Sequence, residues 1–79
     1  MSKKLYVLIS KVMNLPVHII NDDSGPESIE SWTSFKGYVL LSELETVFNV
    51  KFTLDEAMDV KNVADIKRHL NNHGIILND

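Results

Sequence analysis

The sequence lacks cysteine entirely, and it contains few of the residues that break helices, with three glycines and two prolines. Without cysteine the chain can form neither a disulfide framework nor a thiolate metal site. Long apolar runs are also missing, since no segment approaches the roughly 20 apolar residues that a membrane-spanning helix needs. A chain of 79 residues is long enough for one small domain, whose stability must then come from well-packed helices.

An excess of positive charge is absent as well. Eleven acidic residues outnumber eight basic ones, which gives a net charge of −3. This balance disfavours a nucleic-acid partner, because clustered lysine and arginine bind phosphate backbones; it suits a protein partner with a basic patch. The first 17 residues begin like a signal peptide, but Lys11 and Asn14 interrupt the apolar run and no small-residue cleavage site follows. We expect a cytoplasmic monomer that contacts no membrane.

Apolar residues recur at helical spacing over most of the chain. A first stripe predicts a helix over about 3–14, and its members are Leu5, Leu8, Ile9 and Val12. A second helix is predicted over 34–48. Its wide apolar face consists of Phe35, Tyr38, Val39, Leu41, Leu44 and Phe48, with Leu40 and Val47 flanking it. Gly37 lies in its first turn, where glycine costs about 1 kcal/mol relative to alanine. We favour a frayed helix end over close approach of another molecule as the reason for this glycine.

Capping signals predict two further helices. Thr53 and Glu56 form a capping box that opens a short helix over about 54–59. Asn62 is positioned to cap a last helix, and Gly74 is placed to terminate it. The apolar stripe of this last helix consists of Val63, Ile66 and Leu70.

The predicted fold class is an all-α, four-helix bundle in a single domain, residues 1–79, with a short third helix and a long loop between the first two. A loop as long as 15–33 is uncommon in a compact domain and is usually functional or pinned. Ile29 and Trp32 are the apolar side chains that we expect to pin it. Val50 and Phe52 are predicted to form a buried connector, because the chain offers no second strand for pairing.

The spacing of the candidate metal ligands disfavours a metal site. The acidic stretch 21–27 does not match a calcium-binding loop, since Glu27 stands where that loop requires glycine. His69 and His73 are one helical turn apart, but no third ligand with suitable spacing accompanies them. We therefore expect no bound metal, and a structural role for His18 in the loop.

Ser34 stands where the second predicted helix begins, and two interpretations are open. A serine at this place is a common N-cap, worth about 1 kcal/mol. It can also be a hydroxyl displayed for chemistry. A hydrolase nucleophile needs a general base and an oriented third group, and it usually lies in a Gly-x-Ser-x-Gly turn that this sequence lacks. We therefore expect that the chain is not an enzyme by itself.

From Ile29 to Phe52 the chain resembles the acyl carrier and peptidyl carrier proteins. In that family a Trp-Asp-Ser-Leu segment opens the second helix, and residues 32–35 read WTSF here. An apolar-Glu pair followed by phenylalanine closes that helix, and residues 44–48 read LETVF. The short connector, the short third helix and the last helix follow in the family's order. The resemblance therefore covers nearly the whole chain.

The resemblance implies a role for Ser34. In the family a separate phosphopantetheinyl transferase attaches 4′-phosphopantetheine from coenzyme A to this serine, and the thiol of the arm carries acyl or aminoacyl groups as thioesters. The prosthetic group would then supply the thiol that the cysteine-free chain lacks. A helix N-terminus also favours the phosphodiester anion. The implied function is an acyl carrier for the loading and transfer enzymes of fatty-acid, polyketide or related specialised biosynthesis.

Two departures from the family concern recognition by partners. Thr33 replaces the usual aspartate, which in carriers helps to engage the transferase and its magnesium. Phe35 replaces the usual leucine with a larger apolar residue. Together with Tyr38 and Glu45, these are the residues that we expect to contact the partner enzymes.

Other functions stay open. One alternative is a carrier-derived helical interaction module, in which Ser34 only caps its helix and is never phosphopantetheinylated. Its docking face would consist of Tyr38, Leu40 and Val47. A DNA-binding helical domain is a third possibility, which the acidic balance disfavours.

Overall fold

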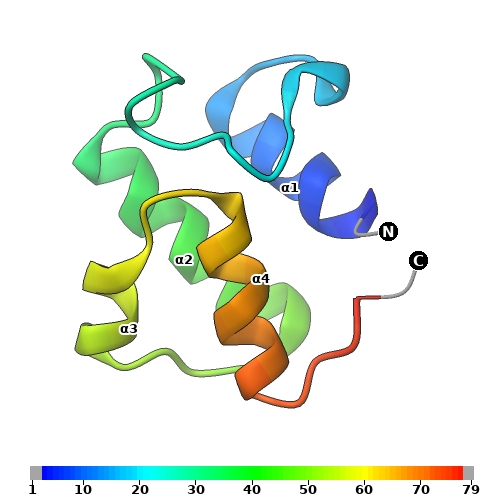
Figure 1. Ribbon diagram of the computed structural model, residues 1–79, viewed down its shortest axis with the longest axis vertical. Helices are drawn as coiled ribbons and strands as arrows, with labels where there is room; N and C mark the ends of the chain where they lie inside the picture. Colours follow the sequence, from blue (N-terminus) through cyan, green and yellow to red (C-terminus); the bar gives the residue numbers. More distant parts are fainter. Residues whose placement is uncertain (1–2, 78–79) are drawn as a thin grey trace.

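The computed structural model describes residues 3–77 and shows an all-helical chain (Figure 1). Its elements are α1 (Lys3–Met13), a 3-10 turn η1 (Val17–Ile19), α2 (Ser34–Phe48), α3 (Leu54–Asp59) and α4 (Val63–Asn72). No strand occurs in these residues. The all-α prediction, with a short third helix and a long loop before α2, is confirmed. Residues 1, 2, 78 and 79 of the predicted domain lie outside the described residues.

The N-termini of α3 and α4 are capped as the sequence predicts. The Thr53 hydroxyl oxygen accepts from the Glu56 N–H at 3.2 Å, while the Glu56 carboxylate accepts from the Thr53 N–H at 2.8 Å. Asn62 Oδ1 accepts from the Asp65 N–H at 2.9 Å. Side chains thus satisfy some of the N–H groups that the first turn of a helix leaves without partners.

A residue with left-handed backbone conformation follows each of the helices α1, α2 and α4. These residues are Asn14 (φ 59°), Asn49 (φ 55°) and Gly74 (φ 85°). Asparagine and glycine adopt this conformation more easily than other residues. In each case the next N–H bonds back to a carbonyl of the last helical turn. These bonds join Leu15 to Ser10, Val50 to Glu45 and Ile75 to Leu70, at 3.0 to 3.1 Å.

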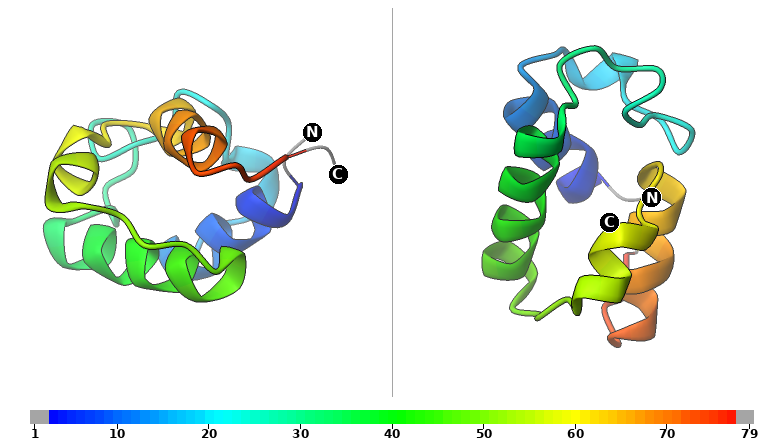
Figure 2. Two further views of the ribbon diagram at one scale, coloured as in Figure 1. Left: turned by 90° about the horizontal axis from the view of Figure 1, so that it is seen from below. Right: turned by 90° about the vertical axis from the view of Figure 1, so that its left-hand side faces the viewer.

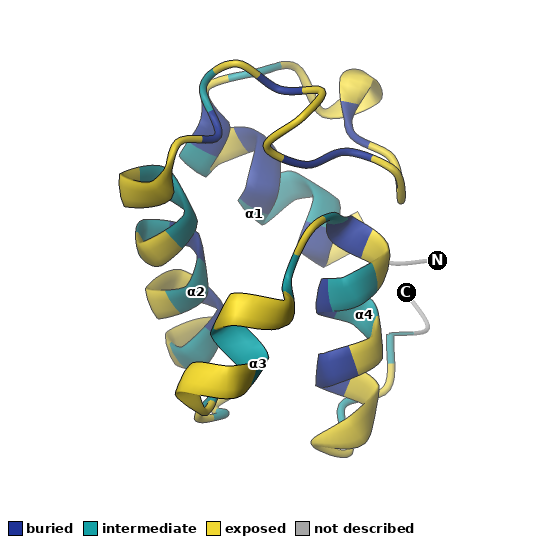
Figure 3. Ribbon diagram, turned by 60° about the vertical axis from the view of Figure 1, so that its left-hand side comes forward, coloured by how far each residue is buried: buried dark blue, intermediate teal, exposed yellow. Residues whose placement is uncertain are grey.

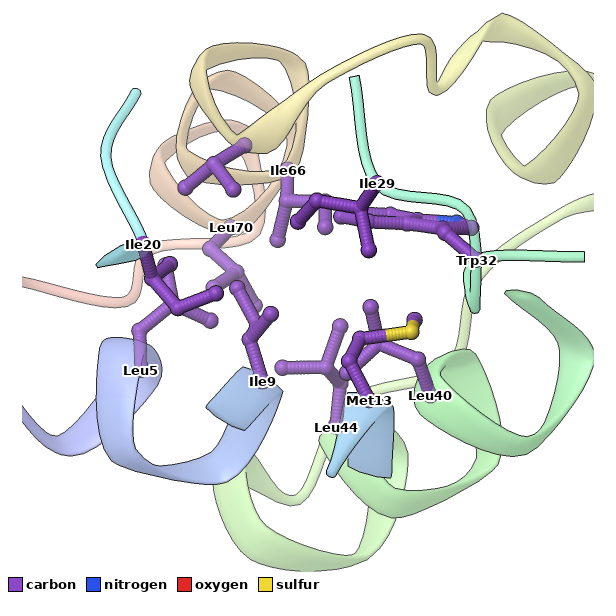
Figure 4. Packing of buried hydrophobic residues seen from close by; sticks show 11 residues of the cluster. Leu5, Ile9, Met13, Ile20, Ile29, Trp32, Leu40, Leu44, Ile66 and Leu70 are labelled. Atoms are coloured by element: carbon purple, nitrogen blue, oxygen red, sulfur yellow. The ribbon is translucent and has the colours of Figure 1, made fainter. Parts of the chain in front are cut away.

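The core lies where α1, α2 and α4 face one another, with buried residues on their inner sides (Figure 3). Its members are Leu5, Ile9, Met13, Ile20, Ile29, Trp32, Leu40, Leu44, Val63, Ile66 and Leu70 (Figure 4). Ile29 and Trp32 reach this core from the long loop, which confirms that they pin it. Val50 and Phe52 are half-buried in the connector and pack against the core.

The long loop is also attached through its backbone to the start of α4. The Ser24 carbonyl accepts from the Val63 N–H, and the Asp22 carbonyl accepts from the Ala64 N–H, both at 2.9 Å. Gly25 permits this approach, because a Cβ there would lie 2.2 Å from the Lys61 carbonyl oxygen. Figure 2 shows the loop crossing one end of the molecule, between the α2 side and the side of α3 and α4. The loop thereby fixes the position of the chain that enters α2.

The predicted apolar face of α2 is partly wrong. Leu40 and Leu44 are buried, at 1% and 0% exposure, whereas Phe35 and Tyr38 are 72% and 66% exposed. Apolar residues occur nearly all round this helix, so their spacing does not single out a buried side. Phe35 lies five residues before Leu40 and therefore roughly 140° from it around the helix. The exposed aromatic side chains remain available to other molecules.

Candidate functional site

Thr33, rather than Ser34, is the N-cap of α2. Its backbone is extended (φ −83°, ψ 174°), and its hydroxyl oxygen accepts from the Lys36 N–H at 3.2 Å. The Thr33 carbonyl accepts the first helical bond, from Gly37, at 2.8 Å. Ser34 is the first residue within the helix, so the interpretation of Ser34 as the cap is wrong. Capping thus leaves the Ser34 hydroxyl unused.

The start of α2 presents Ser34 to solvent in a favourable place for an anion. Ser34 is exposed. Among the described residues, no acceptor bonds to the backbone N–H groups of Ser34 and Phe35. These N–H groups lie at the positive end of a 15-residue helix. A phosphate ester on the Ser34 oxygen would lie where the helix favours negative charge.

A pocket of about 450 Å³ opens beside Ser34. It lies between α2, α3, the long loop and the first half of α4, and its lining includes Trp32, Gly37, Leu40, Leu54, Met58 and Ile66. Its volume is within the range of small-molecule sites, and its lining is mostly apolar. An exposed hydroxyl and an apolar pocket therefore share one region of the surface.

Large apolar side chains surround this region without being buried. Phe35 and Tyr38 of α2 and Leu54 and Met58 of α3 are each at least 66% exposed. Tyr38, Leu54 and Met58 also line the pocket. Exposed apolar groups gathered in one place are typical of surfaces that bind other molecules. We call these four residues the apolar rim.

The four residues predicted for partner recognition have different environments. Thr33, Phe35 and Tyr38 are exposed at or near the start of α2. Glu45 is half-buried near the other end of the helix, and its carboxylate accepts from the Phe52 N–H at 2.9 Å. Glu45 therefore has a structural contact that holds the connector before α3.

Polar contacts attach α3, one wall of the pocket, to α4. Asp59 accepts from Arg68 at 2.7 Å and from the ring Nε2–H of His69 at 2.9 Å. The hydrogen bond from Arg68 lowers the pKa of Asp59, and that from His69 acts in the same direction. Glu56 accepts from the Nε2–H of His73 at 2.8 Å. The Thr53 backbone N–H is the largest cause that lowers the pKa of Glu56, and the bond from His73 adds to it.

The histidines and the acidic loop have protein partners. His69 and His73 contact the carboxylates of α3, and no group of three metal-ligating side chains occurs within residues 3–77. In the loop, Asp22 forms an ion pair with Lys67 at 2.7 Å and accepts a hydrogen bond from Tyr6. The hydrogen bond from Lys67 lowers the pKa of Asp22, and that from Tyr6 adds to it. The acidic loop is therefore tied to α1 and α4.

Sequence reasoning missed most of the pocket. Leu54 and Met58 carry no signal of their own, because they become a pocket wall only when α3 packs beside α2. The significance of Gly37 was also missed. A Cβ at this position would contact only the Trp32 ring, and this contact cannot be read from the sequence. The adjacency of Thr33 and Ser34 was a usable signal, because either hydroxyl residue is a good N-cap.

No family model matches this chain, and no curated protein matches it. In the described part of the chain, no helix combines the length and the apolar character needed to cross a bilayer. The function must therefore be inferred from the residues and the geometry around Ser34.

Proposed function

We propose that this protein is an acyl carrier, which receives a 4′-phosphopantetheine arm on Ser34 and presents acyl or aminoacyl groups to partner enzymes. The observation that carries the proposal is the position of Ser34. Its exposed hydroxyl begins α2, has no capping role and lies at the edge of a mostly apolar pocket. The proposal also rests on the resemblance of residues 29–52 to carrier proteins.

The residues around Ser34 fit such an arm. The free N–H groups of Ser34 and Phe35 are placed to favour its phosphodiester. When attached, the arm supplies the thiol that the cysteine-free chain lacks, and this thiol holds the acyl group as a thioester. The pocket offers apolar surface next to the attachment point. The chain itself provides the hydroxyl and the binding surface, whereas the partner enzymes provide the catalytic groups.

The attachment reaction requires a phosphopantetheinyl transferase and coenzyme A. The Ser34 oxygen attacks the coenzyme A phosphorus that bears the pantetheine, and a new Ser34 O–P bond forms. The P–O bond of the pyrophosphate breaks, and adenosine 3′,5′-bisphosphate leaves. The hydroxyl proton passes to a base of the transferase. The carrier needs no base of its own near Ser34 for this step.

Intact-protein mass spectrometry tests the proposal. Incubation with coenzyme A, magnesium and a broad-specificity transferase should add one phosphopantetheinyl group. The added mass should vanish in Ser34→Ala and persist in Ser42→Ala, which removes another exposed serine of α2. Thr33→Asp should speed the modification, because it restores the acid of the carrier family. If wild type and Thr33→Asp both stay unmodified, the carrier function is wrong.

A second candidate function is the helical interaction module without modification. The exposed apolar rim favours it, because these side chains together offer a large apolar surface for contact with a partner protein. The docking face first predicted for it requires correction, since Leu40 is 1% exposed and belongs to the core. Under this alternative no transferase adds mass to the protein, and Ser34→Ala behaves as wild type. The mass assay therefore separates the two functions.

A further inference from the structure

Trp32 has a hydrogen-bond donor to which no group in residues 3–77 offers an acceptor. The residue is 5% exposed, yet its indole N–H donates to no acceptor among the described residues. Within residues 3–77, His69 Nδ1 is the one fully covered side-chain nitrogen or oxygen without a hydrogen-bond partner. Trp32 Nε1 also lacks a partner but is not in that class, so part of this nitrogen is accessible from outside the core. In Figure 4 this nitrogen lies at the end of the ring system away from Leu5 and Ile20. Buried indole N–H groups normally have a partner.

Gly37 leaves space beside this donor. A Cβ at Gly37 would lie 3.5 Å from Trp32 Nε1, which is ordinary contact, and its nearest neighbours would all belong to Trp32. Backbone conformation does not require glycine here, since the one glycine with positive φ in residues 3–77 is Gly74. Alanine would also be the better helix former. Glycine at position 37 therefore leaves open space next to the indole N–H. Trp32 and Gly37 both line the pocket.

We propose that the pocket binds an acyl group whose chain bears a second oxygen acceptor beyond the thioester carbonyl, such as a 3-keto group, and that this second oxygen accepts from the Trp32 N–H. An oxygen at about 2.9 Å from the nitrogen would lie close to the position that a Gly37 side chain would fill. The mostly apolar lining accommodates the rest of the acyl chain. This inference rests on the proposed function, because it names the class of acyl group carried.

The single tryptophan makes the donor directly observable. A ¹⁵N-labelled protein gives one indole N–H signal, which can be compared in three forms loaded on Ser34: the arm alone, hexanoyl and 3-oxohexanoyl. We expect the 3-oxohexanoyl form alone to move the indole proton downfield and slow its exchange about tenfold, as one net hydrogen bond can. Equal signals in the two acylated forms would overturn the inference. A response to the arm alone would also overturn it, because an amide of the arm would then be the acceptor.

A second arm of the experiment does not depend on modification. Hexanoyl and 3-oxohexanoyl thioesters of N-acetylcysteamine are titrated into the unmodified protein. The 3-oxo compound should produce the downfield indole shift, and the hexanoyl compound should not. If Ser34 is never modified but this shift occurs, the acceptor site stands and the carrier function falls. If Ser34 is modified but neither experiment moves the signal, the carrier function stands and the acceptor site falls.

Gly37→Ala provides the matched variant. The added methyl group should abolish the indole response to the 3-oxo compound by filling the space beside the donor. The fold should survive, and the melting temperature should rise by up to about 5 °C, because alanine favours the helix. Ser42→Ala, an alanine substitution on an exposed position of the same helix, should leave the response unchanged. An unchanged response in folded Gly37→Ala would overturn the proposed site.

Discussion

Thr33 and Ser34 are adjacent hydroxyl residues with different environments at the start of α2. The Thr33 oxygen is bonded to the Lys36 N–H and caps the helix. Ser34, one residue later, has helical backbone geometry and an exposed side chain. The Thr33 cap supports the helix, while the next hydroxyl remains accessible. A variant at either position should therefore affect one property much more than the other.

Thr33→Ala should destabilise the protein by about 1 kcal/mol through loss of the cap, whereas Thr33→Ser should retain most of the stability. Ser34→Ala should change the free energy of unfolding by no more than about 0.5 kcal/mol, because it removes an exposed hydroxyl without a capping role. Urea unfolding of the three variants measures these differences. A larger loss in Ser34→Ala than in Thr33→Ala would show that the cap is assigned to the wrong residue.

At the scale of the element, α3 depends on its neighbours. It has six residues, none of them buried, and a helix this short is not stable alone in water. Its capping box and its contacts with Arg68, His69 and His73 of α4 hold it in place. Because α3 supplies Leu54 and Met58 to the pocket, the attachment of α3 also determines the shape of the pocket.

Acid should loosen α3 from α4. The folded protein lowers the pKa of Glu56 and Asp59 from their ordinary values of 4.5 and 3.8. A lowered pKa means that the folded protein binds the ionised carboxylate form more favourably than the unfolded chain does. The two carboxylates therefore contribute their full stabilisation of the fold at pH values above 4.5 and 3.8. This contribution is lost as the pH falls through the lower pKa values of the folded protein. The amide NMR signals of residues 54–59 should therefore shift in that acid range before the core unfolds.

The double variant Glu56→Gln, Asp59→Asn is the control for this prediction. Glutamine preserves the side-chain acceptor of the capping box, and neither new side chain titrates. Part of the acid response should remain, because Asp22 and Asp65 also have lowered pKa values through hydrogen bonds elsewhere in the protein. If the variant shows the same pH response in residues 54–59 as wild type, the contacts with α4 do not control α3.

At the scale of the whole molecule, one core carries the stability of a chain without disulfides. Leu44→Ala should cost about 2–5 kcal/mol, because Leu44 is 0% exposed and truncation leaves a cavity. Leu54→Ala makes the same change at a residue that is 69% exposed, and it should cost no more than about 0.5 kcal/mol. Thermal and urea unfolding distinguish the two. If Leu44→Ala and Leu54→Ala lose the same free energy of unfolding, Leu44 is not a core residue and the buried side of α2 is assigned wrongly.

Much of this architecture could be predicted from the sequence, because local signals determine it. The bounds 34–48 and 54–59 agree with α2 and α3, and the cap at Asn62 is where it was expected. The buried face of α2 could not be predicted, since a helix that is apolar nearly all round is oriented only by its neighbours. The interpretation of Ser34 as the N-cap, one of the two left open, is off by one residue, because threonine and serine cap almost equally well and the backbone conformation decides between them.

The candidate site shows the same limit. Ser34 could be found from its position at a helix start and from the resemblance to carrier proteins. The pocket could not, because the long loop, α2, α3 and Ile66 of α4 form it from residues between Pro26 and Ile66. The open Trp32 donor was equally hidden, since it depends on which acceptors surround the folded indole. A candidate residue can be picked out from local sequence signals, whereas the space around it requires the packed structure.

The carrier function is tested most directly by the covalent state of Ser34 in the protein purified from its native cells. Proteolysis and tandem mass spectrometry of the peptide that contains residues 32–38 would identify the group on this serine. We predict one phosphopantetheinyl group on Ser34, with an acyl group on its thiol in part of the molecules. An unmodified Ser34 in all molecules, or the same group on another serine instead, would contradict the carrier function.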